Sequence, residues 1–486
     1  MKRFVTEYAL YRWRYVIGYT IAALLVTGVF IFGAFFVPDG LRIEEREAAL
    51  ISGSLSYTDF DPTTVVNLPY HLLQRLSFEI LGVTTISIKL ASVLLGLLSV
   101  IGIFVLLREW FRDNVAIITG FIALSMPALI FAAQDGTAAI FVIATSVWLL
   151  VSAMHVSRQR KPRIFWEMLA FTLVGFLLYA PLGIYLVLAV ASTIIFHPHL
   201  RIMVRRLNVN VLVAGSLLAL LLMAPLIYSV TSQSDIGLRL LGVPTEQPDF
   251  RDNAITLFTQ LFGSVSGDTF FATPPLLSLG ILAITVIGTY RFFLIKHTAR
   301  SYIIWFWSLT LLPFVYLNPQ YTVYLLPLTV LMVGMGIDAL TKNWYSMFPL
   351  NPYARVVGLL PLTIIVVGII FSGIGRYAII YNNSPEVAGK FSQDLRLLDT
   401  ALATIERQED RQIPILVDAA EQPFYELVAS YRDDIAVQTN VTQTLPIVAN
   451  HSFAERSEIA ADPSRIITNK MREDADRFYI YTDAPE

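Results

Sequence analysis

The 486-residue sequence contains no cysteine, which excludes disulfide bonds and metal sites built from thiolates. Charged residues are also scarce, since they make up 15% of the chain where a soluble domain carries about 25%. The formal net charge is only −2, so the chain lacks the basic field that nucleic-acid-binding proteins present. No small-residue cleavage site of the A-x-A type precedes the first apolar stretch, and we therefore expect residues 15–37 to form a retained helix.

Apolar residues are the ones present in excess. They account for 55% of the chain, and the mean hydropathy is +0.62. They cluster in runs of about 18–23 residues, the length at which a helix crosses ~30 Å of hydrocarbon. This pattern predicts an all-α polytopic membrane protein with about eleven transmembrane helices. The predicted spans are 15–37, 86–107, 115–132, 137–155, 164–179, 181–197, 210–230, 274–294, 301–317, 322–340 and 356–375.

Lysine and arginine residues near the ends of these spans alternate between rich and poor loops. The rich loops hold Lys2, Arg3, Arg12, Arg14, Arg108, Arg112, Arg158, Arg160, Lys161, Arg163, Arg201, Arg205, Arg206, Arg291, Lys296, Arg300, Lys342 and Arg355, whereas the poor ones, without the C-terminal tail, hold Arg42, Arg46, Arg75, Arg239 and Arg251. Cytoplasmic loops are the basic ones in membrane proteins. We therefore expect the N-terminus in the cytoplasm, and residues 38–85, 231–273 and 376–486 on the extracytoplasmic side.

The longer outer segments carry structure of their own. Residues 41–53, 68–81 and 252–262 place apolar residues at helical spacing beside charged ones, which is typical of amphipathic helices at a membrane surface. We expect a transmembrane domain over residues 1–383, with the candidate site in its first outer loop at 38–85. A small soluble, extracytoplasmic α/β domain is expected over residues 384–486.

Within the tail, hydrophobic periodicity predicts alternating strands and helices. Helices are expected at 387–405 and 422–431, and strands at 413–417, 435–438 and 478–481.

The most informative polar feature is the pair Glu44-Glu45, which follows the first span. Two adjacent carboxylates near the outer surface can supply a general base or a metal ligand, because partial burial raises the proton affinity of a carboxylate toward working pH. The alternative is two solvated charges on an amphipathic helix, with Arg42 and Arg46 as neighbours.

The order of motifs around this pair gives a family resemblance. In sequence order they are Glu44-Glu45, Leu68-Pro69-Tyr70, Phe78 to Gly82-Val83, Arg108 to Phe111, Tyr179-Ala180-Pro181-Leu182-Gly183, Ala224-Pro225 and Tyr324-Leu325-Leu326-Pro327. The chain resembles the polyprenyl-phosphate-sugar glycosyltransferases of the GT-C superfamily, namely glycosyltransferase family 39 and its bacterial aminoarabinose-transferase-like relatives. The resemblance covers about residues 15–340 and is strongest over 41–111.

The resemblance implies an enzyme that moves a sugar from a polyprenyl-phosphate carrier in the outer leaflet to an acceptor hydroxyl on a lipid, glycan or protein. The anomeric configuration inverts, and a first-loop carboxylate is the base, which by position is Glu44 with Glu45 as its neighbour. It also implies a multi-pass protein of a prokaryotic plasma membrane. Arginine can grip the lipid phosphate through two donors. The candidate substrate-binding residues are Arg42, Arg46, Arg75, His71, Asp135, Arg239, Arg251 and Tyr324.

Several departures from the family pattern keep other interpretations open. Glu44 stands where the family usually has Asp, Val66-Asn67-Leu68 stands where relatives often have Glu-Lys-Pro, and Asp135 is shifted in position. A divalent metal is left open, with no other cofactor expected. His71, or Asp59 and Asp61, are candidates to replace a missing ligand, although the two aspartates also fit a turn before Pro62.

Two alternative functions follow from the same features: a transporter or flippase for a lipid-linked sugar, and a non-catalytic relative that serves as a scaffold.

Three ionisable residues close to span ends, Lys89, Glu167 and Asp338, are expected to reach water by snorkelling.

Overall fold

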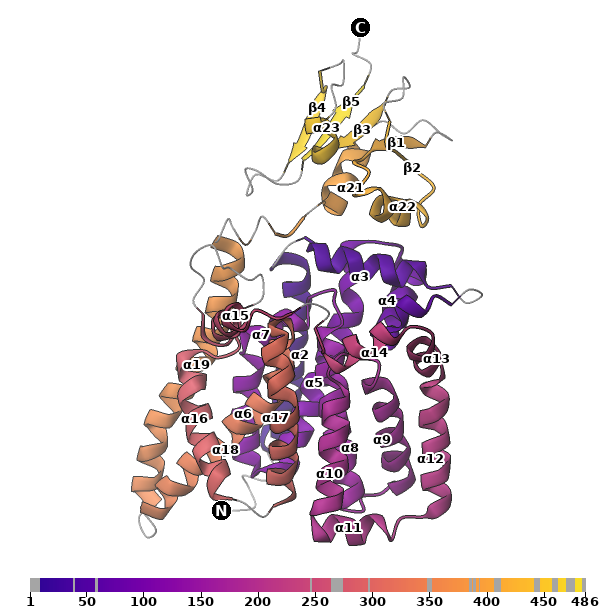
Figure 1. The fold of residues 1–486 in the computed structure, drawn as a ribbon. Helices are drawn as coiled ribbons and strands as arrows, with labels where there is room; N and C mark the ends of the chain where they lie inside the picture. The colour runs from indigo at the N-terminus through magenta and orange to yellow at the C-terminus, as the bar shows by residue number, and fades with distance from the viewer. Residues whose placement is uncertain are drawn as a thin grey trace.

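A computed structural model shows a bundle of long helices with a small α/β unit on one end (Figure 1). The structure describes residues 9–482 except 38–39, 57–59, 245–246, 264–273, 296–297, 348–351, 384–386, 388–389, 393, 406–411, 441–445, 457–461 and 469–476.

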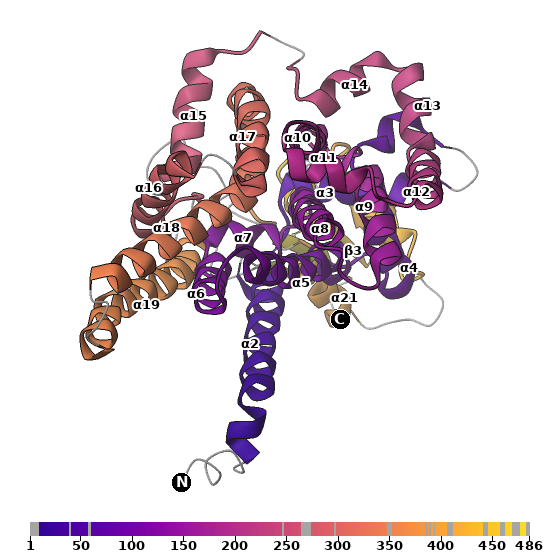
Figure 2. The same ribbon diagram turned by 90° about the horizontal axis from the view of Figure 1, so that it is seen from below.

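Each predicted span falls on one helix or on two consecutive helices. These helices are α2 (Ala9–Phe36), α5 (Thr85–Trp110), α6 (Asp113–Leu124), α7 (Pro127–Ala132), α8 (Ala139–Ser157), α9 (Arg163–Leu177), α10 (Ile184–Phe196), α12 (Val209–Leu222), α13 (Ala224–Ser232), α16 (Leu279–Leu294), α17 (Ala299–Leu317), α18 (Leu326–Met347) and α19 (Pro352–Asn383). Figure 2, seen from below, shows α2 projecting from the bundle on one side and α18 with α19 projecting on another.

Four of the described helices are long and apolar enough to cross a membrane: Thr85–Trp110, Ala139–Ser157, Pro319–Met347 and Leu360–Tyr381. Three bent helix pairs raise this number to seven if each pair counts as one span. The chain is therefore an integral membrane protein, whereas the count of eleven crossings and their orientation stay predictions.

Local sequence explains where the helices around the site begin and end. Helix α5 starts at a capping box, in which Ser87 N donates to Thr84 Oγ1 at 3.1 Å and Thr84 N donates to Ser87 Oγ at 2.9 Å. The predicted span 115–132 is divided into α6 and α7, because Pro127 occupies the first turn of α7 and disfavours a helical conformation at Met126.

Two short helices of the first outer loop lie across the end of the bundle. They are α3 (Ile43–Ser54) and α4 (Leu68–Leu81), and Figure 1 shows them between the long helices and the α/β unit. The three segments predicted to be amphipathic helices are therefore confirmed as helices, namely α3, α4 and α15 (Phe250–Phe262). The remaining short elements are η1 (Pro62–Val65), α11 (Pro198–Val204), α14 (Ser234–Leu241) and η2 (Pro319–Leu325).

The C-terminal unit is a mixed five-stranded sheet in the order β2-β1-β3-β5-β4. Its elements are α21 (Asp394–Thr404), β1 (Ile413–Leu416), α22 (Gln422–Ala429), β2 (Ile435–Gln438), β3 (Ile447–Asn450), α23 (His451–Arg456), β4 (Arg465–Thr468) and β5 (Arg477–Tyr481). Strand β1 is parallel to β2 and β3, whereas β5 is antiparallel to β3 and β4. The three predicted strands correspond to β1, β2 and β5, while β3 and β4 were not predicted.

The C-terminal unit shares a hydrophobic core with the first outer loop. Buried Leu41, Ala49 and Phe78 from the loop pack in one cluster with Leu398 and Tyr425 from α21 and α22. In addition, Leu41 and Ser392 form an isolated antiparallel bridge, in which Leu41 N donates to Ser392 O at 2.7 Å and Ser392 N donates to Leu41 O at 2.8 Å. The position of α3 is therefore set from both sides, by the bundle and by the C-terminal unit.

Candidate functional site

A cavity of about 1120 Å³ lies between the end of the bundle and the C-terminal unit. Residues of α3, α7, α8, α14 and η2 line it on the bundle side, and Glu421, Asn450, His451 and Ser452 line it on the other. Ligand pockets ordinarily measure about 300–1,000 Å³. The cavity is therefore slightly larger than an ordinary ligand pocket.

Helix α3 gives its two adjacent glutamates different environments. The Glu44 side chain is 61% exposed and lines the cavity, with its Oε2 3.3 Å from Nη1 of Arg42. The Glu45 side chain is 1% exposed. Neighbouring residues of a helix point about 100° apart, so one carboxylate faces the cavity while the next is turned into the protein.

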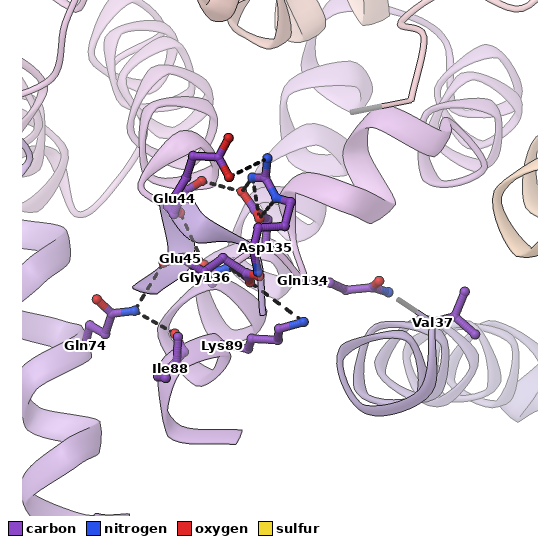
Figure 3. A network of polar contacts seen from close by, with 12 residues as sticks. Val37, Glu44, Glu45, Gln74, Ile88, Lys89, Gln134, Asp135 and Gly136 are labelled. Atoms are coloured by element: carbon purple, nitrogen blue, oxygen red, sulfur yellow. Dashed lines mark hydrogen bonds and ion pairs between the residues drawn. The ribbon is translucent and has the colours of Figure 1, made fainter. Parts of the chain in front are cut away.

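Glu45 is held by three groups, and Figure 3 labels two of them, Gly136 and Lys89, beside it. Arg42 N donates to Oε2 at 2.7 Å, and Gly136 N donates to Oε1 at 2.6 Å. Lys89 Nζ lies 3.7 Å from the same Oε1. Burial raises the pKa of Glu45, and the charges of Lys89 and Arg42 act against this effect. Glu45 thereby connects α3 to α5 and to the segment that precedes α8.

Arg42 and Asp135 form a second, buried contact at the edge of the cavity. Nη2 of Arg42 donates to Oδ1 at 2.7 Å and to Oδ2 at 2.8 Å, and Nε donates to Oδ1 at 3.2 Å. The guanidinium carbon lies 5.1 Å from the centre of the Phe131 ring, and Thr137 Oγ1 also donates to Asp135. Burial by itself lowers the pKa of Arg42. The nearby carboxylates have the larger combined effect, so the pKa of Arg42 lies above its usual value.

Two predictions about charged residues near helix ends are wrong. Lys89 does not snorkel to water, because it is 1% exposed and its partner Glu45 approaches from α3. Glu167 is 3% exposed and accepts a hydrogen bond from Arg163 Nε at 2.6 Å. In both cases an ion pair replaces contact with water. The partner of Glu167 lies on the same helix, whereas the partner of Lys89 lies on a different one. The Asp338 side chain is 13% exposed and pairs with Lys342, which is 45% exposed.

Arg46 connects α3 to the C-terminal unit. Its Nη2 donates to Asp394 Oδ2 at 2.8 Å, its Nη1 donates to Glu421 Oε1 at 3.3 Å, and its guanidinium carbon lies 5.2 Å from the Phe424 ring centre. Tyr425 Oη donates to the same Asp394 oxygen at 2.8 Å. Arg46 lines the cavity, but these bonds fit a residue that positions the two parts relative to each other.

The other predicted residues separate into two groups. Arg239 and Tyr324 line the cavity. Arg75, His71 and Arg251 are not among its described lining residues: Arg75 pairs with Glu79 at 3.3 Å, and Arg251 is exposed on α15. The structure thus brings Arg42, Glu44, Arg46, Asp135, Arg239 and Tyr324 to one cavity.

His71 lies in a buried hydrogen-bonded cluster behind α3. Its Nδ1 is 2.8 Å from Ser52 Oγ, which in turn donates to Gln74 Oε1 at 2.6 Å. Burial lowers the pKa of His71 to about 4. Asp61 caps η1 by accepting from Thr63 N at 2.9 Å, as the turn interpretation requires, whereas Asp59 lies outside the described residues.

Some residues of the site were not found from the sequence. Lys390 and Tyr321 line the cavity, and Gly136 supplies a backbone donor to Glu45. Gly136 directly follows Asp135, so its place beside the predicted carboxylate was an available signal. Lys390 carries no such signal, because no other predicted site residue lies near it in the sequence. Among the described residues, no group of three or more histidine, aspartate or glutamate side chains is placed to hold a metal ion.

Comparisons with known proteins agree with this architecture. The family model of dolichyl-phosphate-mannose-protein mannosyltransferases matches residues 68–228, about a third of the chain. No curated protein sequence matches the chain.

The chain is similar in fold to ArnT from Cupriavidus metallidurans bound to undecaprenyl phosphate, with a TM-score of 0.56 and 13% sequence identity over 98% of this chain and 100% of that chain. It is also similar to the Archaeoglobus fulgidus oligosaccharyltransferase tethered with an acceptor peptide, with a TM-score of 0.51 and 11% identity over 87% of this chain and 64% of that chain. The resemblance predicted from the sequence is therefore confirmed, and the chain has the fold of the GT-C glycosyltransferases.

Proposed function

We propose that this protein transfers a sugar from a polyprenyl-phosphate carrier to an acceptor hydroxyl, with inversion at the anomeric carbon. Glu44 removes the acceptor proton as the acceptor oxygen bonds to the anomeric carbon. The bond between that carbon and the phosphate oxygen breaks, and its electron pair leaves with the polyprenyl phosphate. The observation that carries the proposal is the Glu44 carboxylate, which is 61% exposed and lines a cavity of about 1120 Å³.

The surroundings of Glu44 support its role as the base. Arg42 lies 3.3 Å from its carboxylate and is itself fixed by Asp135. A base held by a fixed cation keeps one orientation toward the acceptor, so little reorganisation is needed during the reaction. Glu45 takes no part in proton transfer in this proposal, because it is enclosed by Gly136, Lys89 and the Arg42 backbone.

The departing lipid phosphate needs positive charge on the cavity wall. Arg239 is exposed on α14, lines the cavity and forms no ion pair with the described residues. We assign the phosphate to Arg239, because Arg42 and Arg46 are already engaged with carboxylates. Lys390 also lines the cavity. The bound undecaprenyl phosphate of the Cupriavidus metallidurans protein supports a lipid phosphate as the ligand class.

The proposal includes a topology and a domain division. We infer eleven membrane crossings, a cytoplasmic N-terminus in a prokaryotic plasma membrane, a transmembrane domain over residues 1–383 and an extracytoplasmic domain over residues 384–486. The absence of cysteine makes this easy to test with single introduced thiols. In intact cells a membrane-impermeant maleimide should label Ser430→Cys in the tail, and it should not label Arg160→Cys in the connection between α8 and α9.

Glu44→Gln tests the chemistry, because an amide keeps the size of the side chain and cannot accept the proton. Transfer from undecaprenyl-phosphate sugars should fall by about 10²–10⁴-fold. Glu47→Gln is the matched control, since Glu47 is exposed on the same helix and is not a described lining residue of the cavity. A flippase or a scaffold would tolerate Glu44→Gln, so unchanged function in this variant would favour those alternatives.

A further inference from the structure

A second cavity, of about 430 Å³, lies at the opposite end of the bundle from the candidate site. Helix α8 connects the two: Ala139, its first residue, lines the first cavity, and Arg158, directly after its last residue, lines the second. The 19 residues of α8 measure about 28 Å along the helix axis. The described residues that line the second cavity are Val105, Arg108, Glu109, Asp113, Arg158 and Arg160.

The cavity lies at the depth of lipid headgroups. Helices α5 and α8 are both long and apolar enough to cross a membrane, and both end at this cavity. Headgroups begin where the hydrocarbon core of about 30 Å ends. Three arginines against two carboxylates give the lining a formal charge of +1, so an anionic headgroup is the kind of group that this charge favours.

The three arginines differ in how firmly they are held. Arg158 donates to the Glu109 carboxylate, and its Nη2 also donates to Glu109 O at 2.6 Å. In contrast, Nε of Arg108 is 3.4 Å from Asp113 Oδ1, and Nη2 of Arg160 is 3.5 Å from Glu109 Oε1. Both distances exceed the usual 2.7–3.2 Å, and the two side chains are 53% and 58% exposed. A guanidinium has five N–H donors, so Arg108 and Arg160 can grip a phosphate while Arg158 stays fixed.

The turn after α8 directs two of these arginines to the same partner. Gln159 lies between Arg158 and Arg160 and has φ 52°, in the left-handed region that glycine usually occupies at a helix end. Arg160 N donates to His155 O at 3.0 Å, which closes the end of the helix. Both arginines contact Glu109 at the end of α5. The charged lining is therefore positioned by two helix ends that are joined through side chains.

An apolar surface leads along α5 to the charged lining. Leu94, Leu98 and Ile101 are exposed on α5. Val105 is half-buried and lines the cavity, as does Arg108. Steps of three or four residues place all five on one face of the helix. Acyl chains can lie along such a face with their phosphate at Arg108, whereas a free phosphate ion gains nothing from it.

We propose that this second cavity binds the phosphate of an acidic phospholipid, with Arg108 and Arg160 as its ligands and the acyl chains along α5. The site is separate from the proposed chemistry. Only the leaflet rests on the proposed function, whose topology places the cavity on the cytoplasmic side, where anionic lipids attract basic segments.

Lipid binding by the purified full-length protein tests the proposal. Native mass spectrometry should show that phosphatidylglycerol binds more tightly than phosphatidylcholine with the same acyl chains. Arg108→Gln and Arg160→Gln should each weaken phosphatidylglycerol binding about fivefold. Arg205→Gln is the matched control and should leave it unchanged. Arg205 is exposed beyond α11 at the same end of the bundle (Figure 1), and it is not a described lining residue of the cavity.

The thermal midpoints of all three variants in phosphatidylcholine should match that of the wild type, because exposed ion pairs contribute little to stability. The proposal is overturned if the two lipids bind equally, or if Arg205→Gln weakens binding as much as Arg108→Gln does. It is also overturned if inorganic phosphate at the concentration of the lipid displaces phosphatidylglycerol, since the ligand would then be a free anion. A failure of the proposed function is visible separately, as unchanged transfer in Glu44→Gln, and does not alter these binding results.

Discussion

Arg42 and Asp135, which are 93 residues apart in the sequence, form a forked ion pair with both carboxylate oxygens within 2.8 Å of one guanidinium nitrogen. The Arg42 side chain is 9% exposed and that of Asp135 is 4% exposed. This pair fixes the start of α3 against the segment between α7 and α8. Since Arg42 also contacts Glu44, the orientation of the proposed base depends on a carboxylate from a distant part of the chain.

Asp135→Asn should destabilise the protein strongly. Removing one partner of a buried pair leaves an uncompensated charge, which costs about 3–5 kcal/mol. The measurement is the thermal midpoint in detergent. Asp113→Asn is the control, because its partner Arg108 is 53% exposed and such surface pairs contribute about 0–1 kcal/mol. Equal effects of the two substitutions would contradict the structural role of Asp135.

Gly136→Ala tests how tightly Glu45 is enclosed. A Cβ atom at position 136 would lie 2.9 Å from Ile88 Cγ2 and 3.1 Å from Glu45 Oε1. We expect a loss of about 1–3 kcal/mol from overpacking, accompanied by reduced transfer because α3 shifts. Gly368→Ala is the control, since its Cβ would meet nothing within 4 Å. A Gly136→Ala protein as stable and active as this control would show that the enclosure has room to relax.

Much of the architecture follows from local sequence. Runs of apolar residues give the long helices, and the amphipathic patterns of 41–53 and 68–81 give α3 and α4, because both signals are carried by residues close together in the chain. The position of Glu44, directly after the first long helix, likewise placed a carboxylate at the end of the bundle.

The parts that were missed depend on contacts between distant residues. Lys89 looked like a charge able to reach water, yet it is buried because Glu45 from another helix lies beside it. Strands β3 and β4 are four residues long, as are the predicted strands β1 and β2, so length does not explain why they were missed. Both missed strands pair with β5, which is a contact between distant residues. The sequence predicts Arg46 as a substrate-binding residue, but it does not predict its ion pairs with Asp394 and Glu421, which come from the C-terminal unit.

Arg46→Met should loosen the C-terminal unit from α3. The substitution keeps much of the apolar contact with Phe424 while leaving Asp394 and Glu421 without their cation. We expect faster proteolysis after α19 and a lower thermal midpoint, because two partly buried carboxylates lose their partner. Arg75→Met serves as the control, since its partner Glu79 is 40% exposed. If proteolysis of the two variants is the same, Arg46 does not hold the unit in place.

His71 should make the stability of the protein depend on pH. Burial lowers the pKa of His71 from 6.5 to about 4, so between these values the unfolded chain binds more protons at this position than the folded chain does. Stability therefore rises as the pH increases through this window and is lost as the pH falls. The full effect is about 3 kcal/mol, since one pKa unit corresponds to about 1.4 kcal/mol.

His71→Asn removes the titrating group and retains a side chain able to bond Ser52. The thermal midpoint, measured from pH 4 to 6.5, should change less steeply with pH in this variant than in the wild-type protein. His199→Asn is the matched control, because His199 is exposed and its replacement should leave the slope unchanged. A slope that is the same in all three proteins would mean that His71 is protonated as easily in the folded protein as in the unfolded chain.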